Sequence, residues 1–462
     1  MPAKVANQHQ ERSAVMSPPA EEARINPLAA ALNEKIQAHS PEVLEMLSAY
    51  GRRLYFPKGI LSQSAEAKAQ AHRFNATIGI ATEGGGPMHL QSVQQFLQEM
   101  PPEEIYPYAP APGRPGLRTH WRAKIEAENP SLQGKHFGLP IVTSAITHGL
   151  SLVGELFLDP DDVVLLPDKL WGNYRLSYEV RLGAQIETYP FYREGGFDVE
   201  ALASRLAEVA RGRSKVLVLL NFPNNPTGYM PTAAEADRIV EVLREQAEKG
   251  TRLVVVADDA YFGLFYHLGG ASSTESLFAR LTGLHENLLA IKLDGATKEL
   301  FVWGLRCGFI TFGPGRSDDS EAVCDALEAK VKGAIRAGIS NVPQLSQSLV
   351  ERALASPTID QERSEKCEIL RARAEKVYEV ANRAQYAGSW SVYPFNSGYF
   401  MCVEVKGVDA EQLRLHLLSE YGVGLISTSA SDLRIAFSCL EVDQVEPLFE
   451  DLHKAIQTLR SA

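Results

Sequence analysis

The chain is 462 residues long, which is more than one hydrophobic core comfortably supports, so two lobes are expected. It is 45% hydrophobic and 22% charged, as is ordinary for a globular protein. Its 57 acidic and 46 basic residues give a formal net charge of -11, which repels nucleic acid and anionic membranes and predicts that neither is a partner.

The five cysteines indicate a reducing compartment. They are odd in number and form neither a CxxC pair nor a zinc-like spacing, so we expect no disulfide framework and no metal site. The N-terminus lacks the apolar run of a secretory signal, and no stretch approaches the length of a membrane span. Together these features predict a cytoplasmic protein.

Along the chain, residues 1–25 are polar and contain prolines, which predicts a mobile N-terminal arm. Helical patterns continue to about residue 55. From Tyr108 onward short apolar runs alternate with longer helical stretches, which predicts an α/β domain with a mostly parallel sheet covered on both faces. The apolar runs span residues 163–167, 215–221, 253–258, 288–293 and 307–312.

One connection illustrates how the helices are encoded. Thr232 can cap a helix, and Glu235 follows three residues later as its capping-box partner. Beyond about residue 340 the pattern changes to a long helix, strands near residues 399–405 and 433–437, and a closing helix. That tail predicts a second, smaller α+β domain.

Four motifs fall at the ends of the apolar runs, where open α/β sheets gather their ligand sites. The first is Asn-Phe-Pro-Asn-Asn-Pro-Thr-Gly over residues 221–228, which is also compatible with ordinary turn chemistry. The second is Asp-Asp-Ala-Tyr over residues 258–261. Its first carboxylate ends a buried strand and needs a partner, which either a helix terminus or a cationic ring nitrogen would supply.

The third motif places Lys298 eight residues before Arg306. A lysine amine forms Schiff bases with aldehydes, and arginine grips a phosphate with two hydrogen bonds, although either residue alone is more often a solvated surface charge. The fourth is Arg434, embedded in the apolar run 433–437. A buried arginine needs an anion, so a structural salt bridge and a substrate carboxylate are equal alternatives.

The order of these motifs resembles the class I/II aminotransferases of the aspartate aminotransferase superfamily, enzymes of pyridoxal-5′-phosphate (PLP) fold type I. The resemblance extends from about Asn75 to about Leu440. It implies a large domain with a mostly parallel seven-stranded sheet between helices, plus a smaller α+β domain. Residues 101–335 would form the large PLP-binding domain and residues 336–462 the small domain, while residues 26–100 would contribute to the small domain and to active-site closure.

The resemblance also implies roles around the cofactor ring. Lys298 would be the Schiff-base lysine and the base that moves the substrate proton. Asp258 would pair with the pyridine nitrogen and keep it protonated, so that the ring acts as an electron sink. Asn225 and Tyr261 would hydrogen-bond the ring hydroxyl, and Trp171 matches the stacking aromatic, although a core aromatic is the alternative.

At the cofactor phosphate, the resemblance assigns Arg306 and the helix start formed by Ala145, Ile146 and Thr147, because helix N-termini attract anions. The chain departs from the family at Gly295, where a serine is frequent, so Thr297 is the candidate for the missing hydroxyl contact. Phe301 also stands where glycine is common, and the phosphate-binding helix start lacks its usual glycines. These departures indicate a divergent branch.

Three further positions follow from the resemblance. Arg434 would bind the substrate α-carboxylate, and Gly79 matches a segment that closes over substrate. Tyr108 matches a tyrosine that reaches the phosphate of the neighbouring subunit, although a surface loop tyrosine is the alternative. The resemblance therefore implies a homodimer with shared active sites.

The implied activity is transfer of an amino group from an L-amino acid to a 2-oxo acid, expected to be 2-oxoglutarate, with ping-pong kinetics. A PLP-dependent lyase or synthase on the same fold is the alternative. A PLP-dependent transcription regulator is opposed by the acidic balance and by the lack of a basic N-terminal domain. The donor is left open, since several arginines are candidates for binding a distal carboxylate: Arg52, Arg53, Arg114 and Arg118.

Overall fold

The computed structural model describes residues 25–56 and 59–461. Apart from Ile25, the arm predicted over residues 1–25 lies outside these described residues. The chain divides into two compact units, with the division after Pro57.

The first unit consists of three short helices, α1 (Pro27–His39), α2 (Pro41–Met46) and α3 (Ala49–Arg53). The Asn26 side chain caps α1 by accepting a 3.0 Å hydrogen bond from the Leu28 amide, and a proline occupies the first helical position. The Asn33 amide donates to the Arg52 carbonyl at 3.0 Å and ties α1 to α3. The helical patterns predicted up to about residue 55 are thus confirmed.

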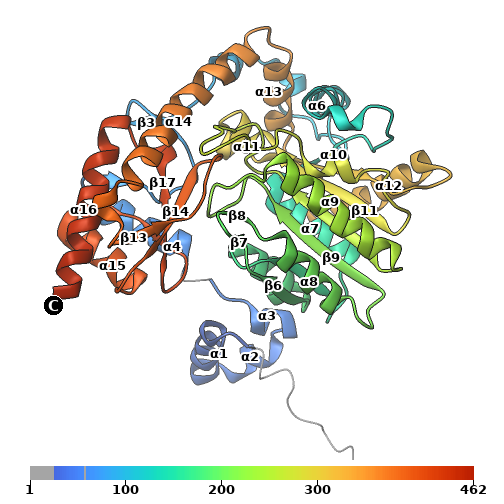
Figure 1. Ribbon diagram of the computed structural model, residues 1–462. Coiled ribbons are helices and arrows are strands. Elements are labelled where there is room, and N and C mark those ends of the chain that lie inside the picture. The colour runs from blue at the N-terminus through green and yellow to red at the C-terminus, as the bar shows by residue number, and fades with distance from the viewer. Residues whose placement is uncertain (1–24, 57–58, 462) are drawn as a thin grey trace, which may run out of the picture. The chain divides into compact units, whose positions relative to one another are not determined.

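The second unit is built around a seven-stranded sheet with the strand order β4-β12-β11-β10-β9-β5-β6 (Figure 1). Only β12 runs antiparallel to its neighbours. The predicted α/β fold with a mostly parallel seven-stranded sheet is therefore confirmed. The strands are β4 (Ile141–Ser144), β5 (Val163–Pro167), β6 (Gln185–Tyr189), β9 (Lys215–Asn221), β10 (Arg252–Asp258), β11 (Leu288–Gly295) and β12 (Cys307–Gly313).

Each predicted apolar run forms one of these strands, whereas β4 and β6 had not been predicted. β6 is an edge strand with the sequence Gln-Ile-Glu-Thr-Tyr, and most of it is only half-buried, so it has no continuous apolar run. β4 has only four residues. Two short hairpins also belong to this unit, formed by β2 (Thr82–Glu83) with β3 (Gly86–Pro87) and by β7 (Tyr192–Arg193) with β8 (Gly196–Phe197).

Helices connect the strands and pack on the sheet. The predicted capping box is confirmed at α9, because Thr232 Oγ1 accepts from the Glu235 amide at 3.2 Å while the Glu235 carboxylate accepts from the Thr232 amide at 2.7 Å. The α-helices of this unit before residue 340 are α4 (Ile60–Gln70), α5 (Gln91–Gln94), α6 (Pro115–Glu128), α7 (Ala145–Phe157), α8 (Val199–Val209), α9 (Ala233–Glu248), α10 (Leu277–Leu281), α11 (Ala296–Glu299) and α12 (Ser320–Gly338).

The C-terminal part contains the predicted α+β region. A four-stranded antiparallel sheet has the order β13-β14-β17-β16, and long helices cover it (Figure 1). A separate pair joins β1 (Phe74–Asn75) in parallel to β15 (Val423–Gly424). The remaining elements are α13 (Gln344–Leu354), α14 (Ile359–Ala381), β13 (Trp390–Val392), β14 (Phe400–Val405), α15 (Ala410–His416), β16 (Ile426–Ser427), β17 (Asp432–Ala436) and α16 (Val442–Ser461).

The domain limits expected at residues 100/101 and 335/336 stay predictions. Within the described part of the chain, no helix combines the length and hydropathy needed to cross a membrane. The described residues also contain no group of three or more His, Cys, Asp and Glu side chains arranged to hold a metal ion.

The sheet register positions the motifs. Asp258 at the end of β10 lies opposite Asn221 at the end of β9 and Leu293 on β11. The residues leading to these ends, Val216 to Leu220 and Leu253 to Ala257, are almost fully buried. Because the three strands are parallel, their carboxyl ends open at the same edge of the sheet, which is where ligands bind in open α/β folds.

Candidate active site

An open cavity with about 760 Å³ of empty space lies at this sheet edge. It brings together residues that are far apart in the sequence. Every predicted site residue except Tyr108 lines it: Gly79, Ala145, Ile146, Thr147, Trp171, Asn225, Asp258, Tyr261, Thr297, Lys298, Arg306 and Arg434.

Asp258 is buried in the cavity wall and is held by neutral donors. The Tyr174 hydroxyl donates to its Oδ2 at 2.6 Å, and the Ala260 amide donates to its Oδ1 at 3.2 Å. Burial raises the pKa of Asp258 to about 6, although the Tyr174 hydrogen bond and the charge of Lys298 oppose the rise. A carboxylate in this position gains from a cationic partner within the cavity.

Lys298 follows the end of β11 on the short helix α11, and its amine lies 5.3 Å from the centroid of the Tyr261 ring. Burial lowers the pKa of Lys298 to about 8; Asp258 opposes this shift and Arg306 adds to it. The lowered pKa increases the fraction of neutral amine near physiological pH, and the neutral form is the one that acts as a nucleophile or base.

Arg434 enters the cavity from β17 and is 1% exposed. Its Nη1 donates to Asn225 Oδ1 at 3.0 Å and its Nη2 to the Thr77 carbonyl at 2.8 Å, while its guanidinium stands 4.2 Å from the Phe400 ring centroid. Both oxygens are neutral, and Nε is buried without a hydrogen-bond partner among the described residues. The arginine thus retains an unneutralised charge and an unused donor.

The remaining donors cluster near the start of α7. Thr297 Oγ1 is buried and has no hydrogen-bond partner within the described chain. A Cβ at Gly295 would lie 2.8 Å from Gly308 Cα and 2.9 Å from the Cys307 carbonyl, so the serine frequent in the family cannot fit there. The steric limit explains the departure at Gly295 and leaves Thr297 as the hydroxyl donor on this wall.

The other two departures from the family occur at residues whose backbone has a positive φ. Ala145 has a φ of 59° and Phe301 a φ of 55°, a left-handed conformation that favours glycine. Arg306, with a φ of 51°, adopts it too. Non-glycine residues in this region cost free energy and tend to cluster at functional sites.

The cavity walls also contain aromatic side chains. Trp171 lines the cavity and packs edge-on against Tyr174, with ring centroids 5.6 Å apart. Gly79 lies close to two aromatic residues, since a Cβ there would be 3.4 Å from the Phe400 ring and 3.7 Å from the Tyr261 hydroxyl. The segment containing Gly79 therefore approaches the ring of Phe400 closely.

Some placements could not be predicted. Tyr108 does not line the cavity and is 89% exposed. Of the arginines considered for a distal carboxylate, Arg114 pairs with Glu351 and Arg118 with Glu328, and neither lines the cavity. The sequence reasoning missed Tyr174 and Phe400 as site residues, although a donor for the buried carboxylate at Asp258 could have been sought among tyrosines beside Trp171.

The residues of the cavity fit PLP. The amine of Lys298, with its lowered pKa, suits the aldehyde of the cofactor, and the buried carboxylate of Asp258 suits the basic ring nitrogen. Arg306, the unpartnered hydroxyl of Thr297 and the start of α7 suit the phosphate. The buried polar atoms of the cavity that lack partners thus lie where such a ligand would provide hydrogen-bond partners.

Comparison with solved structures shows that the chain has the fold of PLP fold type I aminotransferases. An aminotransferase from Anaerococcus prevotii has a TM-score of 0.78 at 23% identity, covering 89% of this chain and 99% of that one. A kynurenine aminotransferase from Pyrococcus horikoshii, solved in complex with PMP, has a TM-score of 0.74 at 16% identity, covering 92% and 100%. At these low sequence identities, the similarity shows a shared fold and no more.

The sequence comparisons give the family. The model for aminotransferase class I and II matches residues 91–452, and the chain belongs to this family, whose members are PLP-dependent transaminases. An aspartate aminotransferase from Musicola paradisiaca is 26% identical over 54% of this chain and 58% of its own length. A probable N-succinyldiaminopimelate aminotransferase from Mycobacterium tuberculosis is 26% identical over 79% and 85%. The predicted family, enzyme class and cofactor are confirmed.

Proposed function

We propose that the protein transfers the amino group of an L-amino acid to a 2-oxo acid, with 2-oxoglutarate as the acceptor, in two half-reactions at one site. The observation that supports this most directly is the state of Arg434. A transaminase must bind an α-carboxylate in both half-reactions, and Arg434 is a buried cation in the cavity without an acidic partner among the described residues.

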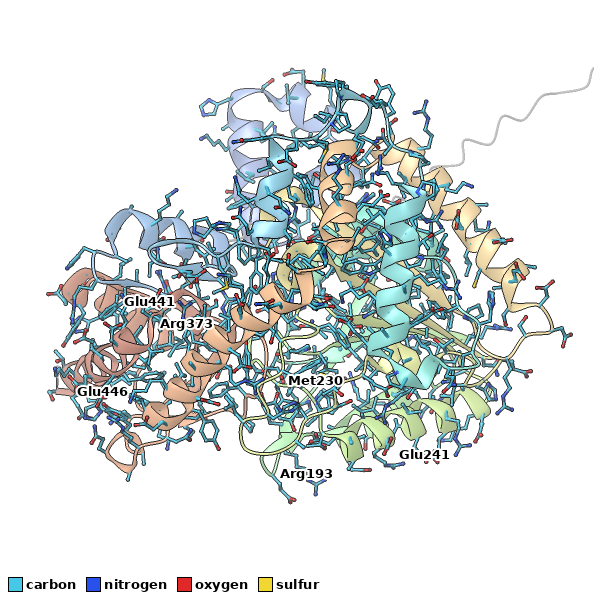
Figure 2. The ribbon with its side chains drawn as sticks, turned by 90° about the horizontal axis from the view of Figure 1, so that it is seen from above. Arg193, Met230, Glu241, Arg373, Glu441 and Glu446 are labelled. Atoms are coloured by element: carbon cyan, nitrogen blue, oxygen red, sulfur yellow. The ribbon has the colours of Figure 1, made fainter. Side chains whose placement is uncertain are left out.

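Other buried arginines of the chain behave differently. Arg118 pairs with Glu328, Arg414 with Glu411, and Arg373 Nη2 lies 2.7 Å from Glu441 Oε2 (Figure 2). Each of these guanidinium groups is neutralised within the protein, as buried charges normally are. The exception at Arg434 favours an anionic ligand over a structural salt bridge, the two alternatives that the sequence left open.

Residues around the cavity divide into a cofactor set and a substrate set in this proposal. Lys298 is the covalent attachment point of PLP, Asp258 pairs with the ring nitrogen, and Asn225 and Tyr261 bond to the ring hydroxyl. Arg306, Thr297 and the start of α7 hold the phosphate, with Ala145, Ile146 and Thr147 at that helix start, and Trp171 packs on the ring. When bound, PLP supplies an electron-withdrawing ring that makes a proton on the substrate Cα acidic.

The chain's own groups then perform the proton chemistry. Lys298 Nζ, whose pKa burial lowers to about 8, is the group that would accept the proton from the substrate Cα. Asp258, whose pKa is raised by burial, would be kept anionic by a cationic ring nitrogen beside it. Arg434 orients the substrate by its carboxylate so that the Cα proton faces the amine. Gly79 and its neighbours cover the substrate.

A panel of amino donors mixed with the PLP-loaded protein tests this function. With a true donor, the absorbance of the bound cofactor changes in a single turnover, one equivalent of 2-oxo acid appears, and 2-oxoglutarate restores the original spectrum. Release of product without formation of the aminated cofactor would instead identify the lyase or synthase alternative. A protein that binds PLP but reacts with no donor would contradict the proposal.

We also propose a homodimer that shares its active sites. The support is Tyr108, whose side chain is 89% exposed and therefore available to a second copy of the chain. Sedimentation of the holoenzyme tests the dimer, and substitution of Tyr108 by phenylalanine should increase the rate of PLP loss if the hydroxyl reaches the partner's phosphate site. The odd number of cysteines, without a CxxC pair, supports the proposed cytoplasmic location.

A further inference from the structure

A half-buried ion pair lies beside the cavity without lining it. Lys169 Nζ is 2.6 Å from Asp432 Oδ2, and the two side chains are 20% and 3% exposed. The Tyr393 hydroxyl donates to the other carboxylate oxygen at 3.0 Å, and the lysine ammonium stands 4.7 Å from the Tyr393 ring centroid. The proximity of Asp432 raises the pKa of Lys169 above its ordinary value despite burial, so the lysine stays charged.

The two partners belong to the two walls of the site. Lys169 follows β5 and precedes Trp171 by two residues. Asp432 is the first residue of β17 and precedes Arg434 by two residues, so both project from the same face of that strand. The pair therefore joins the segment that contains Trp171 to the strand that contains Arg434.

A second contact extends this link to the first motif. The Asn224 side chain donates to the Lys169 carbonyl at 3.1 Å, and the next residue, Asn225, accepts from Arg434 Nη1 at 3.0 Å. Lys169 is thus connected to Arg434 by two routes, through Asp432 along β17 and through Asn224 and Asn225. A displacement of Lys169 should therefore displace the Arg434 guanidinium through both routes.

The location of the pair distinguishes it from other ion pairs. Among those formed within residues 25–56 and 59–461, it alone has both partners within two residues of side chains that line the cavity. Lys215, the first residue of β9, and Asp162, just before β5, for example, form a 2.8 Å pair whose side chains are 29% and 24% exposed. That pair connects β9 to the start of β5, and neither partner lines the cavity.

We propose that Lys169 and Asp432 are positioning residues for the substrate carboxylate, which set the place of Arg434 relative to Trp171. This inference rests on the proposed function, because it takes Arg434 as the carboxylate ligand. Neither residue contacts the groups assigned to the cofactor's phosphate or ring nitrogen. Breaking the pair should therefore weaken substrate binding and leave PLP binding unchanged.

The test uses the PLP-loaded protein and 2-methylalanine, which has the amine and carboxylate common to all donors but no Cα proton. K169M and D432N should each bind it about tenfold more weakly than the wild type, because displacement of a charged ligand group by a fraction of an ångström loses much of its interaction. K169R should restore most of the binding. The matched control K215M should bind like the wild type.

Further readouts separate positioning from a general structural role. The pH titration of the cofactor absorbance should be the same in K169M and the wild type, and KM for donors should rise with kcat changed less than about threefold. Wild-type binding in both K169M and D432N would overturn the inference, as would loss of fold or of PLP in both. Failure of the wild type itself to bind any amino acid would instead contradict the proposed function.

Discussion

The Tyr174 hydroxyl donates a 2.6 Å hydrogen bond to Asp258 Oδ2, and this contact links the aromatic wall of the cavity to its buried carboxylate. The bond stabilises the ionised form of Asp258 and opposes the effect of burial, which raises the pKa of this carboxyl to about 6 even with the bond in place. It follows that Tyr174 helps to keep Asp258 charged at neutral pH.

Replacement of Tyr174 by phenylalanine should move the acidic limb of the pH–activity profile to higher pH by about one to two units, since one charge-assisted hydrogen bond is worth roughly 1.5–3 kcal/mol. The profile of kcat/KM is the measurement. Tyr178 is the matched control, because it is buried close by and its hydroxyl has no partner in the described part of the chain. An equal shift of the pH profile in Y178F would mean that the effect arises from packing and not from the hydrogen bond.

Substitution of Asp258 by asparagine should stabilise the cofactor-free protein. Its folded pKa of about 6 exceeds the ordinary value of 3.8, so the folded state bears the cost of an ionised buried carboxylate above about pH 6. At 1.4 kcal/mol per pKa unit that cost is on the order of 3 kcal/mol, and it should disappear as pH falls toward about 4. Thermal unfolding across this pH range is the measurement, and a pH-independent gain would refute the electrostatic origin.

Gly308 should be required for the shape of the part of the cavity that we assign to the cofactor phosphate. A Cβ there would lie 2.8 Å from the backbone of Ala145, at the start of α7. G308A should therefore displace the helix start and weaken PLP binding by about tenfold or more, measured by equilibrium titration. Gly304 offers a control in the same segment, since a Cβ there meets no atom within 4 Å. Equal affinity in G308A and wild type would contradict the placement of the phosphate.

Arg434 should act on the carboxylate alone. R434L should lower kcat/KM for α-amino acids by about a hundredfold or more, because it removes the charged partner of a desolvated anion. The same variant should react with a simple primary amine that has no carboxylate about as well as the wild type does. Parallel losses with both substrate types would mean that Arg434 serves the fold or the cofactor.

Much of this arrangement could be predicted from the sequence because the first three motifs each follow a strand of the large sheet. The apolar runs before Asn221 and Asp258 made their strands evident, and the parallel register then brings the two residues opposite each other. The order of motifs identified Lys298 and Arg434 by resemblance to a family. Both inferences depend on local sequence patterns that can be recognised without knowledge of tertiary contacts.

The features that were missed depend on contacts between distant segments. The hydrogen bond from Tyr174 spans 84 positions, and no pattern near Asp258 indicates its donor. Phe400 becomes a site residue only because β14 pairs with β17 and brings its ring to Arg434. The steric reason for Gly295 likewise requires the pairing of Gly295 with Gly308.

The most direct test of the central claim is borohydride reduction of the PLP-loaded protein followed by peptide mapping. Reduction should fix the cofactor irreversibly to one side chain, and the modified peptide should contain Lys298. K298M should bind PLP without becoming labelled. A label on any other lysine, or a stoichiometric label on K298M, would contradict the assignment of Lys298 and the site built around it.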